Sequence, residues 1–164
     1  MRRDFSSCLS WRTAEDSQFG AAVFVVLAVI ATAVAFLMWT FRASQNLPRL
    51  GALGQRFSPR WAVGWWFVPI MFLFRPYQVV AEIWRGSAPD SVRQSNLDWQ
   101  LRPSTPLLGW WWAFWLISFF NFSESNVLEL FASAFTICSA ALAIAVVWRT
   151  TKRQDERYRR MAGS

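Results

Sequence analysis

Long apolar runs separated by polar segments dominate the pattern along the chain. At about 1.5 Å per residue, the run over 19–41 extends roughly 34 Å, enough for a hydrocarbon core of about 30 Å. The run over 127–148 is similarly long, whereas the one over 107–122 reaches only about 24 Å. The tryptophans that begin this shorter run are typical of a membrane interface. The pattern therefore predicts transmembrane helices over 19–41, 107–122 and 127–148.

The remaining apolar run, 61–85, is interrupted by an Arg-Pro pair at residues 75–76. The uncharged stretch ahead of this pair would extend about 21 Å as a helix, which is too short to span a bilayer. Pro76 lacks an amide hydrogen, and its ring clashes with the preceding turn of a helix. The sequence therefore predicts an apolar helix over 61–85 that is kinked or broken at this pair.

After the break, four polar side chains recur at helical spacing and fall within a stripe about 80° wide. This polar stripe consists of Arg75, Gln78, Glu82 and Arg85. In one interpretation the segment enters the membrane from the cytoplasm, turns back, and continues as an interfacial helix whose stripe faces water or headgroups. In the other, Trp61 to Trp84 is one kinked span, which would leave Arg75 near mid-membrane at a cost of at least ~2.5–3.5 kcal/mol unless it is paired.

The distribution of basic residues favours the re-entrant interpretation. Three spans place 14 basic residues in the cytoplasm and 3 outside, whereas four spans place 12 inside and 4 outside. Basic loops prefer the cytoplasmic side. We therefore predict an all-α integral membrane protein, a small multi-pass helical bundle of three transmembrane helices plus a kinked re-entrant or interfacial segment. Four transmembrane helices are the alternative. The expected organisation is a polar N-terminal segment (1–18), a single membrane domain (19–149) and a basic cytoplasmic tail (150–164).

Composition supports the membrane class and excludes several functions. Hydrophobic residues make up 54% of the chain and charged residues 16%, against about a quarter charged in a soluble domain. The net charge of +7 comes from loops and the tail, so we expect no nucleic-acid binding. The chain has no His, which removes His-based general bases and most transition-metal sites. No nucleophile–base pair or metal motif is visible, so we expect no enzymatic activity, no metal and no cofactor.

Two motifs resemble a known family. They read SPRWAVGWWFVPIMFLFRPYQVVAEIWRGS and PLLGWWWAFWLIS, beginning at Ser58 and Pro106. With them, roughly Phe41 to Arg149 resembles the bacterial membrane family called domain of unknown function 4328. The resemblance implies a multi-pass membrane protein, usually from a high-GC bacterium, and it implies no activity. Members usually have an Asn before the Pro-Tyr-Gln of the first motif, where this chain has Arg75.

The polar stripe is the candidate site if the protein has chemistry. Glu82 could accept a proton or bind a cation, and Arg75 and Arg85 could hold an anionic headgroup. The plainer interpretation is an amphipathic helix whose polar face is only solvated. A further candidate is the intramembrane acid Glu129, near the start of the last apolar run, which we expect to reach headgroups or to cap a helix N-terminus.

These observations lead to two hypotheses about function. The first is a non-enzymatic accessory or interaction protein of the bacterial cytoplasmic membrane, with its C-terminus in the cytoplasm. Its expected partners are membrane lipids with anionic headgroups, a partner protein or further copies of the chain. The alternative is a small oligomeric transporter or channel lined by the polar stripe of residues 75–85.

Overall fold

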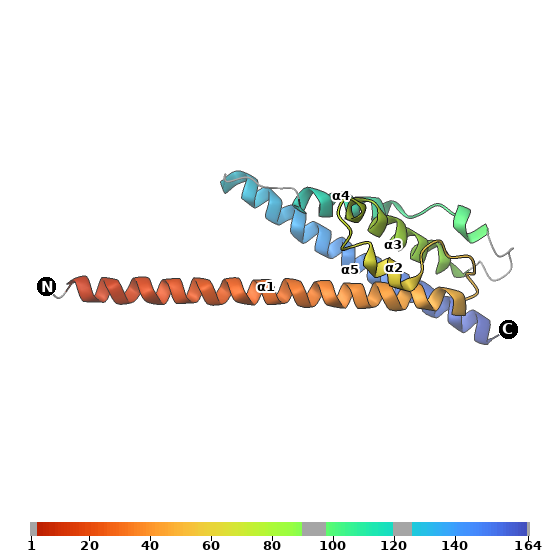
Figure 1. The fold of residues 1–164 in the computed structure, drawn as a ribbon, viewed down its shortest axis with the longest axis horizontal. Helices are drawn as coiled ribbons and strands as arrows, with labels where there is room; N and C mark the ends of the chain where they lie inside the picture. The colour runs from red at the N-terminus through yellow and green to blue at the C-terminus, as the bar shows by residue number, and fades with distance from the viewer. Residues whose placement is uncertain (1–2, 90–97, 120–125, 164) are drawn as a thin grey trace. The chain divides into compact units, whose positions relative to one another are not determined.

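The computed structural model describes residues 3–89, 98–119 and 126–163, and the regular elements in these ranges are all helical (Figure 1). This confirms the all-α fold class. The chain forms two compact units, Met1–Met38 and Trp39–Ser164, and each is described by itself. The helices are α1 (Arg3–Arg49), α2 (Pro59–Gly64), the 3₁₀ turn η1 (Met71–Leu73), α3 (Arg75–Gly86), the 3₁₀ turn η3 (Asp98–Leu101), α4 (Pro106–Phe119) and α5 (Asn126–Ala162).

The first unit is the N-terminal part of α1, and most of its described large apolar side chains, which lie between Phe19 and Met38, are exposed. By length and composition, the helix from Gln18 to Arg49 can cross a membrane. The hydroxyl of Thr32 donates to the carbonyl of Ala28 at 2.8 Å, so this polar group is satisfied inside the helix. The helix predicted over 19–41 is therefore confirmed as a helix, and it extends beyond that range at both ends.

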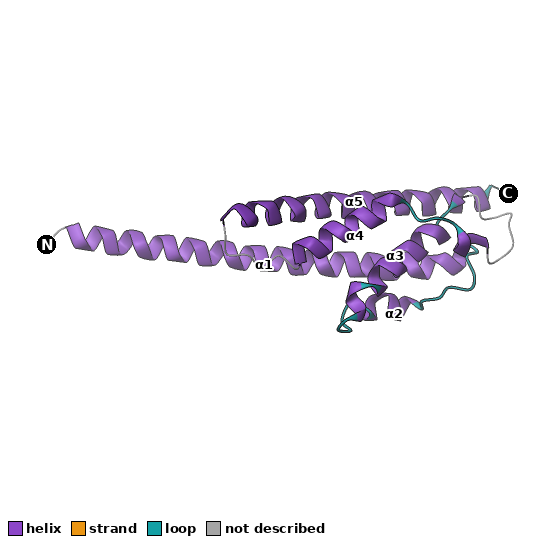
Figure 2. Ribbon diagram, turned by 90° about the horizontal axis from the view of Figure 1, so that it is seen from above, coloured by secondary structure: helices purple, strands orange, loops and turns teal. Residues whose placement is uncertain are grey.

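In the second unit, α4 and α5 lie side by side and run in opposite directions (Figures 1 and 2). The rings of Phe114 and Phe135 pack between them with centroids 5.5 Å apart. From Ser133 to Ala162, α5 has the length and composition to cross a membrane. The 14 residues of α4 are apolar but extend only about 21 Å. The helix predicted over 107–122 is present as far as Phe119, and its last residues lie outside the described part of the chain.

The helix predicted over 61–85 is corrected by the structure to two short helices and a 3₁₀ turn. After six residues α2 ends, and turns lead through Pro69 to η1. Pro69 disfavours helical backbone at the residue before it. Ile70 has a φ of 68°, in the left-handed region, where a right-handed helix cannot continue. The interruption predicted at the Arg-Pro pair thus begins earlier, after Gly64, and α3 begins at Arg75 with Pro76 in its first turn.

Among the described residues of this region, no helix is long enough to be the additional span of the four-span alternative. The 12 residues of α3 extend about 18 Å, well short of a bilayer core of about 30 Å, and α2 is shorter still. Within the described residues, two helices have the length and composition of a span, and they belong to α1 and α5.

Most of α3 is buried at the centre of the second unit. Val79 and Ile83 pack with Leu47 of α1 and with Phe57 of the loop that follows α1. Gly86 allows α1 to approach closely, since a Cβ at this position would lie 2.8 Å from a Leu47 methyl carbon. The segment expected to lie as an interfacial helix on the membrane surface is thus packed against other parts of the protein.

α5 continues as a regular helix through the basic residues that the sequence placed in a tail over 150–164. Gln154 is buried, and its Nε2 donates to the carbonyl of Ala43 at 3.2 Å and to the hydroxyl of Ser87 at 3.1 Å. These bonds join the end of α5 to α1 and to the end of α3. Residues from 150 onward therefore belong to the packed unit, and their cytoplasmic location stays a prediction.

Arg157 closes the C-terminal end of α3. It is 1% exposed, and its Nη1 donates to the carbonyls of Gly86 and Ala88. Gly86 is the last residue of α3. A cation is favourable at a helix C-terminus because it satisfies carbonyls that lack a partner within the helix and complements the helix dipole.

Candidate functional site

The side chains of the polar stripe lie in different environments and do not form one solvated face. Glu82 is 8% exposed, Arg75 and Arg85 are half-buried, and Gln78 is exposed. The interpretation of a merely solvated stripe is therefore corrected for Glu82. Its side chain is directed to the loop that joins α1 to α2, because its hydrogen-bond donors are on that loop.

Both carboxylate oxygens of Glu82 accept hydrogen bonds from the backbone. One accepts the N–H of Arg56 at 2.5 Å, and the other accepts the N–H of Phe57 at 3.2 Å. Burial raises the pKa of the Glu82 carboxyl, while the two N–H groups and the charges of Arg56 and Arg85 act in the opposite direction. This arrangement makes Glu82 an anchor for the loop, whereas the sequence suggested a proton acceptor or a cation ligand.

Arg75 is held in place by a hydrogen bond and by two aromatic rings. Its Nη1 donates to the side-chain oxygen of Gln78 at 3.1 Å. Its guanidinium lies 5.6 Å from the ring centroid of Phe57 and 5.2 Å from that of Trp65. The guanidinium of Arg56 also lies 5.6 Å from the Phe57 ring. These distances are those of cation–π contacts, so two cations meet at one ring.

A cavity of about 260 Å³ lies beside these two cations. We call it the arginine–tryptophan cavity, and its lining residues are Arg56, Phe57, Ser58, Trp61, Trp65 and Arg75. No acid occurs among the described residues that line it. The cavity therefore combines positive charge, one hydroxyl and aromatic walls.

A second cavity, of about 210 Å³, shares Arg56 and Phe57 with the first. Its other lining residues are Tyr77, Gln78, Ala81, Glu82, Arg85, Trp99 and Gln100. The structure thus brings three members of the polar stripe to one cavity and Arg75 to the other. Because Glu82 and Arg85 both line the second cavity, it carries charges of both signs.

The sequence pattern does not single out Arg56, Trp61 or Trp65 as site residues. One signal for Arg56 was present, because the segment over 42–60 carries four arginines and no acid. No local sequence pattern shows that Arg56 and Arg75 lie beside the same aromatic ring. The two side chains approach each other only because α3 packs against the loop that carries Arg56.

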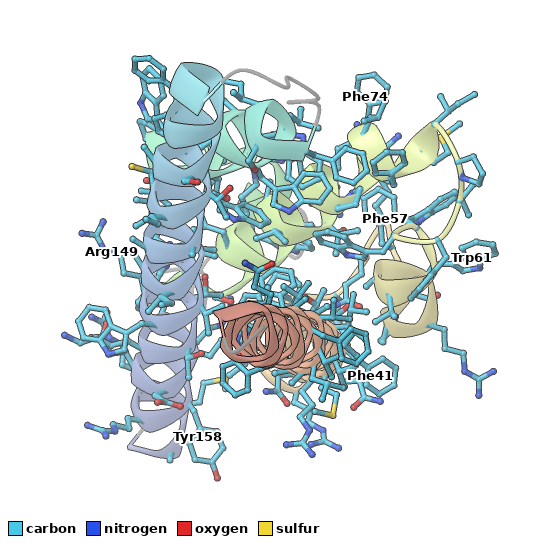
Figure 3. All side chains as sticks on the ribbon, turned by 90° about the vertical axis from the view of Figure 1, so that its left-hand side faces the viewer. Phe41, Phe57, Trp61, Phe74, Arg149 and Tyr158 are labelled. Atoms are coloured by element: carbon cyan, nitrogen blue, oxygen red, sulfur yellow. The ribbon has the colours of Figure 1, made fainter. Side chains whose placement is uncertain are left out.

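Four large apolar side chains are exposed where the chain turns between α2 and α3. This apolar tip consists of Phe67, Ile70, Met71 and Phe74. Phe67 is 72% exposed and Ile70 69%, and Figure 3 shows Phe74 projecting away from the packed side chains. The apolar tip is the most exposed part of a segment that otherwise packs against the protein.

The backbone beneath the apolar tip is fixed to α4. Nε1 of Trp112 donates to the carbonyl of Leu73 at 3.0 Å. The ring of Trp66 makes edge contacts with Trp112 and Trp115, with centroids 6.0 and 5.8 Å apart. Phe72 packs in the same way on Trp115. The tip is therefore presented on an anchored turn.

The remaining candidate of the sequence analysis, Glu129, belongs to α5, and its side chain lies outside the described part of the structure. Among the residues whose side chains are described, no group of three or more His, Cys, Asp or Glu could hold a metal ion.

Comparison with known proteins gives one match. The family model described as Domain of unknown function (DUF4328) matches residues 4–152. No curated protein and no solved structure matches the chain.

Proposed function

The chain belongs to the family of domain of unknown function 4328, and from this premise we propose that it is a non-enzymatic, multi-pass protein of the bacterial cytoplasmic membrane that acts by contacting lipids. Its spans are the apolar parts of α1 and α5 together with α4, whose apolar run continues in the sequence to Phe122. Residues 65–74 form a re-entrant turn that enters the bilayer without crossing it. The observation that carries this proposal is the exposed apolar tip on its anchored base.

The apolar tip and the tryptophan and arginine residues next to it match the acyl and headgroup layers of a lipid leaflet. An exposed cluster of large apolar side chains rimmed by polar groups marks a membrane or protein contact. Here Trp65 and Arg75 flank the tip in the sequence and line one cavity together with Trp61, and these residue types prefer the headgroup level. With the tip among acyl chains, these side chains lie at the headgroups. Removing the tip from water is favourable by about 25 cal/mol per Å² of apolar surface.

The transporter alternative is less well supported by the same geometry. A pathway along residues 75–85 needs polar side chains free to contact a solute. Both oxygens of Glu82 are already bonded to the loop, and most of α3 is buried against its neighbours. We therefore prefer lipid contact as the role of this region.

A spin label at residue 70 tests whether the tip enters the bilayer. Ile70→Cys is made in a Cys8→Ser, Cys138→Ser background and reconstituted into liposomes. We expect this label to collide more often with oxygen, which partitions into lipid, than with a water-soluble nickel chelate. Arg60→Cys, at an exposed position on α2, is the control and should show the opposite preference. If position 70 is as accessible to nickel as position 60, the tip does not enter the bilayer.

The three-span arrangement also predicts the side of each terminus. It places Cys8 outside the cell, while Cys138 lies on the apolar part of α5 and is shielded by lipid. A membrane-impermeant maleimide added to spheroplasts should label the protein once. Cys8→Ser should abolish labelling, and Cys138→Ser should leave it unchanged. Labelling that appears only after lysis would place the N-terminus in the cytoplasm and contradict the arrangement.

A further inference from the structure

We infer that the arginine–tryptophan cavity binds the phosphate group of an anionic phospholipid. The inference rests on the proposed lipid contact, which places this cavity at the headgroup level. Trp65 precedes the apolar tip and Arg75 follows it, so the cavity lies at the base of the segment that enters the bilayer. A lipid with its acyl chains beside the tip has its phosphate near this base.

The cations of the cavity are suited to phosphate. Guanidinium groups present several N–H donors in a fixed plane and bind phosphate oxygens in pairs. Arg56 and Arg75 both line the cavity, and Ser58 adds a hydroxyl that can donate to either of the two charged oxygens of a phosphodiester. Lipid phosphate carries its negative charge on oxygens that accept from all of these donors.

Both arginines are positioned in the structure as it stands. Gln78 and the rings of Phe57 and Trp65 hold the guanidinium of Arg75. Glu82 fixes the backbone N–H of Arg56, so the loop that carries this side chain has a defined place. Binding therefore requires little further ordering of the protein, which favours affinity.

The neighbouring cavity is a poorer place for the same group. It is lined by Glu82, whose carboxylate repels an anion, and the arginine–tryptophan cavity has no acid among its described lining residues. Trp61 and Trp65 give the latter an aromatic wall for the glycerol part of a lipid. The absence of an acid among its described lining residues and its aromatic wall thus make the arginine–tryptophan cavity the better phosphate site of the two.

The test uses the full-length protein in a non-ionic detergent, titrated with phosphatidylglycerol, with bound lipid counted by native mass spectrometry. We expect Arg56→Gln and Arg75→Gln each to weaken binding about tenfold through the loss of a charge-assisted contact. Arg60→Gln removes the same charge from an exposed position outside the cavity and should change binding by less than about twofold. Equal weakening by all three variants would show only general charge attraction and would overturn the inference.

Two further measurements make the result decisive. The side chain of Arg56 is exposed, so Arg56→Gln should keep the wild-type melting temperature and carries the test even if Arg75→Gln fails to fold. Inorganic phosphate in excess should not displace the lipid. Displacement that depends on Arg56 and Arg75 would assign the cavity to free phosphate and overturn the lipid source.

The spin-label experiment at position 70 separates this inference from the proposed function. A lipid-embedded label together with unchanged lipid binding in the Arg56 and Arg75 variants would refute the phosphate site and leave the membrane role standing. A water-exposed label would refute the re-entrant tip, whatever the binding measurement shows.

Discussion

Replacing Glu82 with alanine will lower the free energy of unfolding of the detergent-solubilised protein by about 2–4 kcal/mol. The change leaves the backbone N–H groups of Arg56 and Phe57 without their acceptor. The buried N–H of Phe57 then costs about 1–3 kcal/mol, and the N–H of Arg56 costs less because it is only partly buried. Relief of the desolvation that raises the pKa of Glu82 offsets part of this loss. Thermal denaturation should show a melting temperature lower by something on the order of 10 °C.

Two variants on α3 calibrate this measurement. Glu82→Gln keeps one oxygen as acceptor but turns an amide N–H₂ toward the second backbone donor, so its effect should be intermediate. Gln78→Ala, at an exposed position, removes only a hydrogen bond to Arg75 and should change stability by no more than about 0.5 kcal/mol. If Glu82→Ala is as stable as Gln78→Ala, the carboxylate does not anchor the loop.

Replacing Arg157 with methionine should destabilise the protein by about 2–3 kcal/mol. Methionine retains much of the side-chain volume but leaves the carbonyls of Gly86 and Ala88 without the guanidinium. The buried charge has a desolvation cost of its own, which limits the net effect. Chemical denaturation gives the change in stability, and hydrogen exchange at Ser87 and Ala88 should accelerate because the end of α3 opens locally.

The matched control for this variant is Arg159→Met, two residues further along α5 at an exposed position. It should be close to wild type in stability, because exposed side chains contribute little to folding. A tail that serves only to attract anionic lipid would respond equally to both substitutions. Equal stability of the two variants would therefore refute the role of Arg157 as a cap.

The sequence was sufficient where local chemistry determines the structure. A run of hydrocarbon length predicts the helix in α1, and the missing amide hydrogen of Pro76 predicts the break before α3. The turns between α2 and α3 were not predictable in the same way. Ile70 occupies a left-handed conformation that β-branched residues avoid, so its residue type gives no indication of it.

Contacts between distant parts of the chain explain the other differences. Helical periodicity identified a polar stripe on α3, but it does not say what covers that stripe. The donors to Glu82 lie 25 and 26 residues earlier, and they are backbone groups that any residue type could supply. Arg157 belongs to the segment predicted as a basic tail, and the carbonyls that accept from it lie 71 and 69 residues away in the sequence.

Gln154 and Arg157 donate hydrogen bonds to carbonyls that are synthesised much earlier than these two side chains. Translation proceeds at about 5–20 residues per second, so the carbonyl of Gly86 waits about 4–14 s for the guanidinium 71 residues later. During that interval the carbonyls of Gly86 and Ala88 lack the guanidinium of Arg157, and the carbonyl of Ala43 lacks the amide of Gln154. A chain that ends before residue 154 therefore leaves these carbonyls without their side-chain donors. Completion of α5 therefore sets the moment at which the contacts between α1, the end of α3 and α5 form.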